Sequence, residues 1–190
     1  MSYNKIFEMG VWKTAFNTDL KEYCYNIQSS DKGRTLTNVN GYQSHSLNQS
    51  DKELQPLISH LKYSVNNYID SFLTFERPIK LQNMWININR HGSSNKTHTH
   101  PQSYFSGVYY VSKPANSGNI VFEHMGIDTI NSYWPFIQSS YQKEYNEKNS
   151  VQYQFESISG DCLMFPSYYR HYVRPNLSNE DRISISFNFG

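Results

Sequence analysis

The chain has 190 residues, a net charge of +1 and 17% charged residues. This length favours one domain that is large enough to bury a core. The near-neutral charge and the lack of a Lys/Arg run argue against an electrostatic nucleic-acid binder, and no apolar run approaches the roughly 18 residues of a membrane span. Aromatic residues make up 16%, which favours strands around an aromatic interior.

The two cysteines, Cys24 and Cys162, lie far apart in the sequence. Because no secretory signal pattern precedes them, we expect free thiols in a reducing compartment rather than a disulfide. The sequence therefore predicts a soluble, cytoplasmic protein. We expect one domain over 1–190, in which 1–78 supplies helical and loop support for a core over 79–190.

Helices are predicted in the first third of the chain. An apolar pattern in 3–14 indicates an edge strand, and the polar run that begins at Asn17 is typical of a helix start, whereas 29–48 reads as a loop with room for one short strand. Apolar residues then recur at helical spacing, which predicts a helix from about 51 to 72. Pro56 lies early in this run, so the regular helix is expected to begin there.

The pattern changes to strands after Pro78. Apolar and polar residues alternate in 84–90 and again in 182–189, so each stretch predicts a strand with one polar face. Further short strands are predicted at 107–111, 118–123, 151–157 and 160–166, and a loop at 91–96. Helices followed by six or seven short strands are typical of a mainly β sandwich or barrel that helices buttress.

Two features of this half of the chain indicate a cavity. The polar strand faces fit either an exposed sheet or the lining of a wet cavity, and we favour the cavity because candidate metal ligands lie in the same half. The polar and aromatic excursion at 126–149 is long for a compact domain, so it predicts a lid or binding loop.

The run Thr97-His98-Thr99-His100-Pro101 carries the strongest chemical signal. In an extended strand, His98 and His100 point to the same face, so two imidazoles can hold one metal ion. The pair alone is weak evidence, since seven histidines in 190 residues give about a one-in-four chance of such a pair. His171 is the candidate third ligand, and imidazole suits iron, zinc, copper and nickel.

The stretch from Trp85 to Asn188 resembles the iron(II)- and 2-oxoglutarate-dependent oxygenases. That family combines His-x-Asp, a Tyr-Tyr strand, a Gly followed by an apolar strand, a distal His, and an Arg-x-Ser about eleven residues later. The matching residues here are His98-Thr99-His100, Val108-Tyr109-Tyr110-Val111, Gly118 to Phe122, His171 and Arg182-Ile183-Ser184.

A narrower similarity links the chain to small oxygenases of this family. Trp85-Ile86-Asn87, His98 to Pro101 and Ser106 to Val111 resemble their Trp-x-Asn, His-x-His-Pro and Ser-Gly-Val-Tyr-Tyr-Val signatures. The resemblance implies a double-stranded β-helix (jelly roll), Fe(II) as the metal and 2-oxoglutarate as co-substrate. It also implies an enzyme that hydroxylates a substrate.

One position departs from the family pattern. The usual facial triad is two His and one carboxylate, and His100 stands where the resemblance places an Asp. Three ligand sets are open: His98, His100 and His171 together, two of them with Glu123, or two of them with water. We favour the three histidines because His98 and His100 share a face. Three His also suit catalytic zinc, so the ligands alone do not fix the metal.

The resemblance assigns the far carboxylate of 2-oxoglutarate to Arg182. The planar fork of an arginine donates two parallel hydrogen bonds to a carboxylate. Ser184 shares a strand face with Arg182 and can add a third hydrogen bond. Tyr110 matches a family tyrosine that often contacts the same carboxylate, and Asn87 is a weaker candidate on a polar strand face.

Alternatives remain for the cation and for the function. Arg182 can instead pair with Glu180 or Asp181, and Arg174 is then the fallback cation. A cupin-type metal protein fits the Gly-x5-Pro-x4-His spacing but lacks the glutamate that follows His-x-His in cupins, and a non-catalytic jelly-roll module is a third possibility. The sequence does not specify the substrate, a small molecule or a peptide, or whether the chain forms a homo-oligomer.

Overall fold

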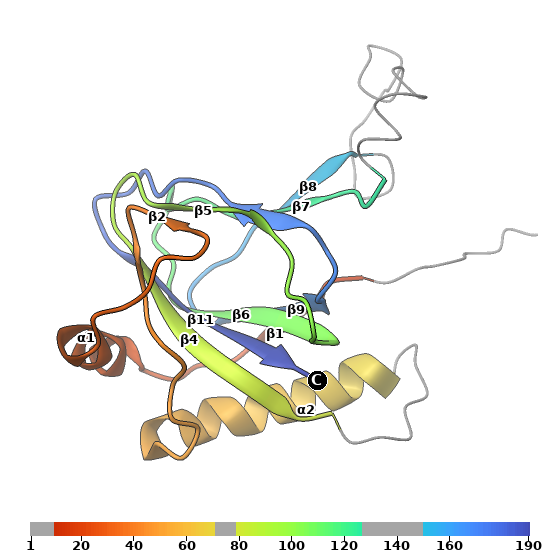
Figure 1. Cartoon of the computed structure of the whole chain (residues 1–190), viewed down its shortest axis with the longest axis horizontal. Coiled ribbons are helices and arrows are strands. Elements are labelled where there is room, and N and C mark those ends of the chain that lie inside the picture. The colour runs from red at the N-terminus through yellow and green to blue at the C-terminus, as the bar shows by residue number, and fades with distance from the viewer. Residues whose placement is uncertain (1–9, 71–78, 127–149) are drawn as a thin grey trace, which may run out of the picture.

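The computed structural model describes residues 10–70, 79–126 and 150–190. Two β-sheets face each other, and both helices lie on the outer side of the larger sheet (Figure 1). The elements are β1 (Trp12–Ala15), α1 (Lys21–Ser30), β2 (Asn38–Val39), β3 (Tyr42–Gln43), the 3-10 turn η1 (Lys52–Leu54), α2 (Gln55–Asp70), β4 (Leu81–Asn89), β5 (Ser94–His98), β6 (Phe105–Ser112), β7 (Ile120–Glu123), β8 (Gln152–Phe155), β9 (Asp161–Pro166), β10 (His171–Val173) and β11 (Arg182–Phe189).

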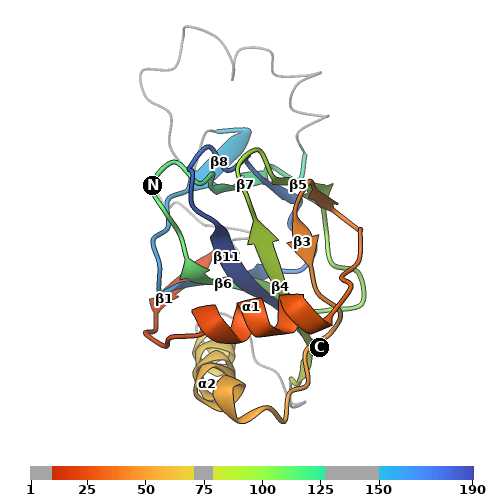
Figure 2. The ribbon, with the colours of Figure 1, turned by 90° about the vertical axis from the view of Figure 1, so that its left-hand side faces the viewer.

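Every strand pairing within the described residues is antiparallel. The larger sheet has the order β1-β9-β6-β11-β4-β3, and the smaller sheet has the order β2-β5-β10-β7-β8. From β4 to β11, consecutive strands therefore pass from one sheet to the other, except that β7 and β8 are neighbours in the smaller sheet (Figure 2). The predicted mainly β fold, two facing sheets buttressed by N-terminal helices, is confirmed.

The long helix forms where the apolar spacing predicts it. Leu57, Leu61 and Val65 repeat every four residues and are buried against the larger sheet. Pro56 stands in the first turn, where its missing N–H costs no hydrogen bond. The 3-10 turn η1 leads directly into α2, so the regular helix begins one residue before this proline.

Strand alternation gives the larger sheet two different faces. β4 and β11 pair over their whole length, with Ile86 opposite Ile185 and Asn87 opposite Ser184. The isoleucine face packs on the helices and forms the main core. The face that carries Asn87 and Ser184 points to the smaller sheet, so the two sheets enclose polar side chains as well as a second apolar cluster.

Several sequence predictions need correction. The expected loop at 91–96 is wrong, because β5 begins at Ser94 and pairs with β2 and β10. β10 was not predicted, and the described residues after α2 hold eight strands, β4 to β11, rather than six or seven. The strands that the sequence pattern did not predict have two to five residues. Segments this short cannot show a repeat, and only their hydrogen bonds to neighbouring strands identify them.

Other predictions meet the structure only in part. The excursion at 126–149 and the first residues of the expected strand at 3–14 lie outside the described residues, apart from Gly126 and 10–14. Cys24 and Cys162 are buried free thiols, as predicted. Neither helix in the described ranges is long and apolar enough to cross a membrane.

Candidate metal centre and co-substrate cavity

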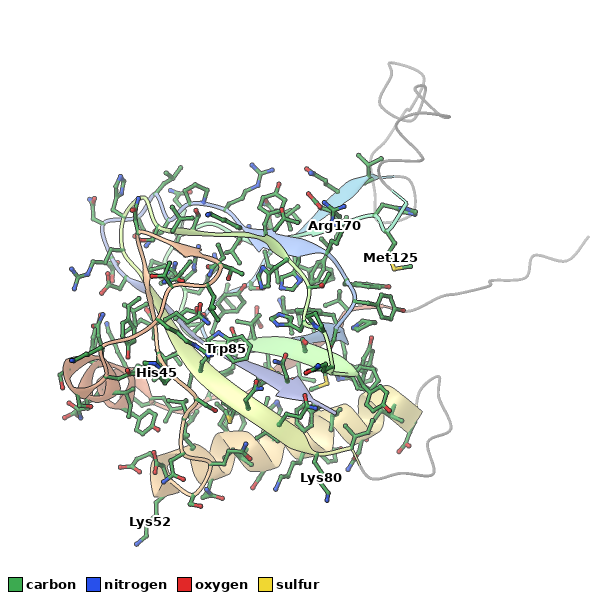
Figure 3. The ribbon with its side chains drawn as sticks, in the orientation of Figure 1. His45, Lys52, Lys80, Trp85, Met125 and Arg170 are labelled. Atoms are coloured by element: carbon green, nitrogen blue, oxygen red, sulfur yellow. The ribbon has the colours of Figure 1, made fainter. Side chains whose placement is uncertain are left out.

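A cavity of about 520 Å³, counting its solvent-filled mouth, lies between the two sheets. Trp85 lies on its floor, on the inner side of β4 (Figure 3). The lining residues are Thr37, Trp85, Asn87, Asn95, His98, His100, Gly107, Val108, Tyr110, Ile120, Phe165, His171, Val173, Arg182, Ser184 and Ser186. The seven residues that the sequence analysis favoured for metal or co-substrate binding are all among them, whereas the alternatives Glu123 and Arg174 are not.

Strand pairing brings His98 and His171 together. His98 is the last residue of β5 and lies directly opposite His171, the first residue of β10. Paired residues of antiparallel strands project to the same face, and these two rings are 4.3 Å apart between centroids. The ring of His100 lies 4.9 Å from that of His98 and 5.2 Å from that of His171. One ring nitrogen of each residue lies within 4.8 Å of the other two.

His100 reaches this cluster by a different route from the predicted one. β5 ends at His98, so the two histidines do not share a strand face as the sequence predicted. The backbone N–H of His100 instead donates to the carbonyl of Ser167, at 2.9 Å. Its ring lies 5.7 Å from that of Trp85. The loop after β9 therefore sets the position of His100.

Hydrogen bonds fix which nitrogen His98 and His171 present. Nδ1 of His98 lies 2.7 Å from the carbonyl oxygen of Lys96, and Nδ1 of His171 lies 2.8 Å from that of Tyr169. Because a carbonyl oxygen only accepts, each ring carries its proton on Nδ1. The lone pair of Nε2 is then free, which is the usual arrangement for histidines that bind a metal.

Burial keeps the three imidazoles neutral. It lowers the pKa of His171 to about 3 and of His100 to about 4, and repulsion from the neighbouring rings adds to the effect. Burial also lowers the pKa of His98. Metal binding requires deprotonated ligands, and these lowered pKa values meet that requirement at neutral pH.

Glu123 lies outside the three-His cluster. His171 pairs with Phe122, so the next residue of β7, Glu123, projects to the opposite face of the smaller sheet. There its carboxylate forms an ion pair with Arg170 at 3.2 Å, and Arg170 lies beside β7 and β8 (Figure 3). Among the described residues, the three histidines have no carboxylate beside them that completes a metal-binding group.

Arg182 is buried at the far end of the cavity, with 1% of its surface exposed. Its Nη1 donates to the backbone carbonyls of Ser117, Gly118 and Arg174. Gly118 has φ +79°, and a Cβ there would overlap the carbonyl of Arg174, so glycine lets the two backbone segments converge. Three carbonyls thus hold one edge of the guanidinium in place.

The other edge of this guanidinium is free. Nη2 of Arg182 is buried and has no hydrogen-bond partner in the described residues. The alternative ion pair is absent there as well: Asp181 accepts a hydrogen bond from the Tyr25 hydroxyl, and Arg182 forms no salt bridge with a described carboxylate. A buried charge with an unused donor is costly unless an anion meets it. The fallback Arg174 has an exposed side chain and contributes only its carbonyl.

The remaining predicted residues surround Arg182. Ser184 lies between Asn87 of β4 and Tyr110 of β6 in the sheet, so all three project into the cavity. Burial raises the pKa of Tyr110 to about 12, although the nearby Arg182 charge opposes that shift, so the phenol stays protonated as a donor. The amide of Asn87 donates to Ser186 at 3.0 Å, which leaves it less available than Ser184 or Tyr110.

Residues 83–188 match a family model described as "Putative 2OG-Fe(II) oxygenase". This match covers more than half of the chain. The chain belongs to the 2OG-Fe(II) oxygenase family. Membership assigns it to the enzymes that use iron(II) and 2-oxoglutarate, rather than to the cupin-type proteins or the non-catalytic modules. A comparison with curated proteins finds no match.

Solved structures agree on the jelly-roll fold. A prolyl-4-hydroxylase from Pseudomonas putida has 11% identity and a TM-score of 0.65, covering 95% of this chain and 92% of that one. A 2OG-Fe(II) oxygenase family protein from Burkholderia pseudomallei has 13% identity and a TM-score of 0.63 over 95% and 85%. HygX from Streptomyces hygroscopicus, with nickel and 2-oxoglutarate bound, has 12% identity and a TM-score of 0.60 over 96% and 83%.

The described residues fit both groups that this oxygenase family uses. Three neutral imidazoles with converging nitrogens suit Fe(II), and the free edge of Arg182 suits a carboxylate. Sequence reasoning missed Ser167 behind His100, and it named Gly118 only as part of the family pattern, without its role behind Arg182. No local pattern reveals either role, because each residue acts through backbone contacts between distant segments.

Proposed function

We propose that this oxygenase hydroxylates an organic substrate at an unactivated C–H bond, with His98, His100 and His171 as the metal ligands. Arg182 then binds the far carboxylate of 2-oxoglutarate. The observation that carries the proposal is the buried, unpartnered Nη2 of Arg182 in the same cavity as the three-His cluster. A cavity with a metal-binding group and a cation that lacks a counter-ion is suited to an acid that chelates the metal.

The residues of the chain have separate tasks in this proposal. When bound, iron with 2-oxoglutarate and O₂ supplies the oxidising chemistry. The imidazoles of His98 and His171 keep their orientation through the Nδ1 hydrogen bonds, so their Nε2 lone pairs stay available to the metal. Arg182 and Ser184 bind and orient the co-substrate, while Val108 and Phe165 line the cavity with apolar surface that excludes water.

The substrate is proposed only as a class, a small molecule or a peptide. The similar solved structures are named as prolyl hydroxylases, an epimerase and a carbocyclase, so the fold supports several outcomes. The described cavity has one charged side chain, Arg182, which the co-substrate would neutralise. Recognition of the substrate therefore falls to neutral polar and aromatic groups within the described lining, such as Trp85 and Asn95.

The test is the affinity of metal-loaded protein for 2-oxoglutarate, measured by anaerobic calorimetry. Removing one partner of a buried, bidentate charge pair costs about 2–5 kcal/mol, so Arg182→Ala should weaken binding roughly 30- to several-thousand-fold. Arg182→Lys should recover only part of the affinity, because an ammonium cannot reproduce the planar fork.

Arg174→Ala is the matched control, since only the backbone carbonyl of Arg174 contacts Arg182, and its exposed side chain is not part of the cavity lining. This variant should bind 2-oxoglutarate like the parent. Metal stoichiometry and melting temperature are recorded for every variant, because Arg182 also supports three carbonyls. Parent-like affinity in a folded Arg182→Ala protein, or a parent that binds no 2-oxoglutarate, would refute the proposed role.

A further inference from the structure

His100 lacks the support that the other two histidines have. His98 and His171 are strand residues, and the Nδ1 of each donates to a backbone carbonyl two residues earlier. His100 lies past the end of β5, and no hydrogen bond to its ring is found in the described part of the chain. Its anchor is the backbone hydrogen bond to the carbonyl of Ser167. The position of His100 therefore depends on what holds Ser167.

Ser167 lies at one end of a row of four side chains that hydrogen bonds link to one another. Its hydroxyl oxygen lies 2.7 Å from that of Ser106, and the Ser106 hydroxyl donates to Oδ1 of Asn188, also at 2.7 Å. The amide of Asn188 donates in turn to Oδ1 of Asn83, at 3.0 Å. A serine hydroxyl has one proton, and that of Ser106 goes to Asn188, so Ser167 must be the donor to Ser106. Every hydrogen bond in the row is therefore donated in the same direction, from Ser167 towards Asn83.

This row of hydrogen-bonded side chains crosses the larger sheet at right angles to the strands. Asn188 of β11 is paired with Asn83 of β4 on one side and with Ser106 of β6 on the other. Ser106 is in turn paired with Phe165 of β9, two residues before Ser167. The row therefore joins the loop after β9 to strands that form the rigid centre of the fold.

The burial of this row indicates a positional role. Ser106 is 0%, Ser167 1% and Asn188 8% exposed. Buried polar groups contribute little net stability even when paired, whereas apolar side chains of similar size would fill the same space without needing partners. What a fully paired polar row adds is one fixed geometry, because each hydrogen bond restricts the next.

We propose that Ser106 and Ser167 are positioning residues for the metal centre, which fix the distance between His100 and His171. Ser167 suits this role because its carbonyl holds His100 and it lies only four residues before His171 in the chain. Its hydroxyl then ties both ligand-bearing segments to the larger sheet. The proposal rests on the proposed function only in taking the three histidines as the ligands.

The test is an anaerobic titration of the metal-free, full-length protein with Co(II), followed by visible absorption. The d–d bands of Co(II) report the number and geometry of its ligands, which a general loss of stability would not change in the folded protein. Loss of a residue that orients a metal ligand typically costs 10- to 100-fold in affinity, so Ser106→Ala should weaken Co(II) binding about that much and alter the bands.

Ser44→Ala is the matched control. The Ser44 side chain is also fully buried and makes two hydrogen bonds, to the carbonyl of His45 and from the N–H of Ile86, but none of these three residues lines the cavity. Both variants should lower the melting temperature of the metal-free protein by similar amounts, and only Ser106→Ala should change the affinity and the bands. Ser167→Ala, which removes the first donor of the row, should behave like Ser106→Ala and replaces it if that variant does not fold.

Two results separate the failure of this proposal from the failure of the proposed function. If His171→Ala abolishes Co(II) binding while Ser106→Ala and Ser167→Ala keep wild-type affinity and bands, the positioning role is wrong and the ligand set stands. If His171→Ala binds Co(II) as the parent does, or the parent binds none, the ligand set itself fails and this proposal fails with it. An equal loss of affinity in Ser44→Ala would also overturn the positioning role.

Discussion

The two faces of the larger sheet are built from the same strands but have different roles. On the helix side, Ile86 and Ile185 pack into a continuous apolar core. On the cavity side, the adjacent residues Asn87 and Ser184 are also buried but polar, and they line the cavity together with the buried charge of Arg182. Strand alternation lets one segment supply stability on one face and a binding surface on the other, so the two properties can be changed almost independently.

The largest expected effect is the loss of metal binding in His171→Ala. His171 is the most buried of the three histidines, and its ring centroid lies 4.3 Å from that of His98 and 4.8 Å from that of Phe165. We expect no stoichiometric iron or zinc in the purified variant, with the helix-side core unaffected. Elemental analysis after dialysis measures this. A variant that keeps one equivalent of metal would show that the cavity face does not bind it through these histidines.

Ile185→Ala should produce the reverse result. Its side chain is fully buried on the helix side, and truncating a buried isoleucine to alanine costs about 2–5 kcal/mol of unfolding free energy. Metal stoichiometry of the folded fraction should stay at the parental value. Denaturant unfolding and metal analysis on one sample measure both.

The neighbouring Ser184→Ala is the matched variant on the other face of the same strand. It should change the unfolding free energy little and weaken 2-oxoglutarate binding about 2- to 10-fold, the effect of one hydrogen bond. If Ile185→Ala weakened 2-oxoglutarate binding more than Ser184→Ala did, the two faces would not be independent.

The pH dependence of the metal-free protein should reveal the buried His171. Its pKa is about 3 in the fold and near 6.5 when unfolded, so the unfolded state binds more protons between these values. Stability is therefore unaffected by this group above pH 6.5 and falls as the pH drops below it, by up to about 1.4 kcal/mol per pH unit. Melting curves at pH 7.5, 6 and 5 should show a shallower decline in His171→Ala, and parallel curves would contradict this.

His100→Asp should have the smallest effect on metal binding, because it restores the usual two-His, one-carboxylate triad. We expect iron affinity equal to or tighter than that of the parent. Binding of the 2-oxoglutarate dianion should weaken, since the new carboxylate offsets part of the metal charge. Anaerobic titrations with Fe(II) and then 2-oxoglutarate measure both steps. Loss of iron with the fold intact would show that this position does not accept a carboxylate ligand.

Much of this molecule follows from its sequence alone. The spacing of apolar residues predicted α2, β4 and β11. Long elements with one buried face need apolar residues at regular intervals, so their sequences show a clear repeat. The His-x-His pair, His171 and the Arg-x-Ser that follows were sufficient to indicate a metal and an acidic co-substrate. The family match and the common cavity agree with that interpretation.

Only the tertiary structure decided how these residues meet. β10 has three residues, too few for a repeat, and it forms a strand through its pairing with β5 on one side and β7 on the other. His100 joins the cluster through the carbonyl of Ser167 rather than through strand alternation, and the partner of Glu123, Arg170, lies on the far side of the smaller sheet. Contacts between segments that are distant in the chain leave no local pattern, so the hydrogen bonds that hold His100 and Arg182 could be found only in the folded chain.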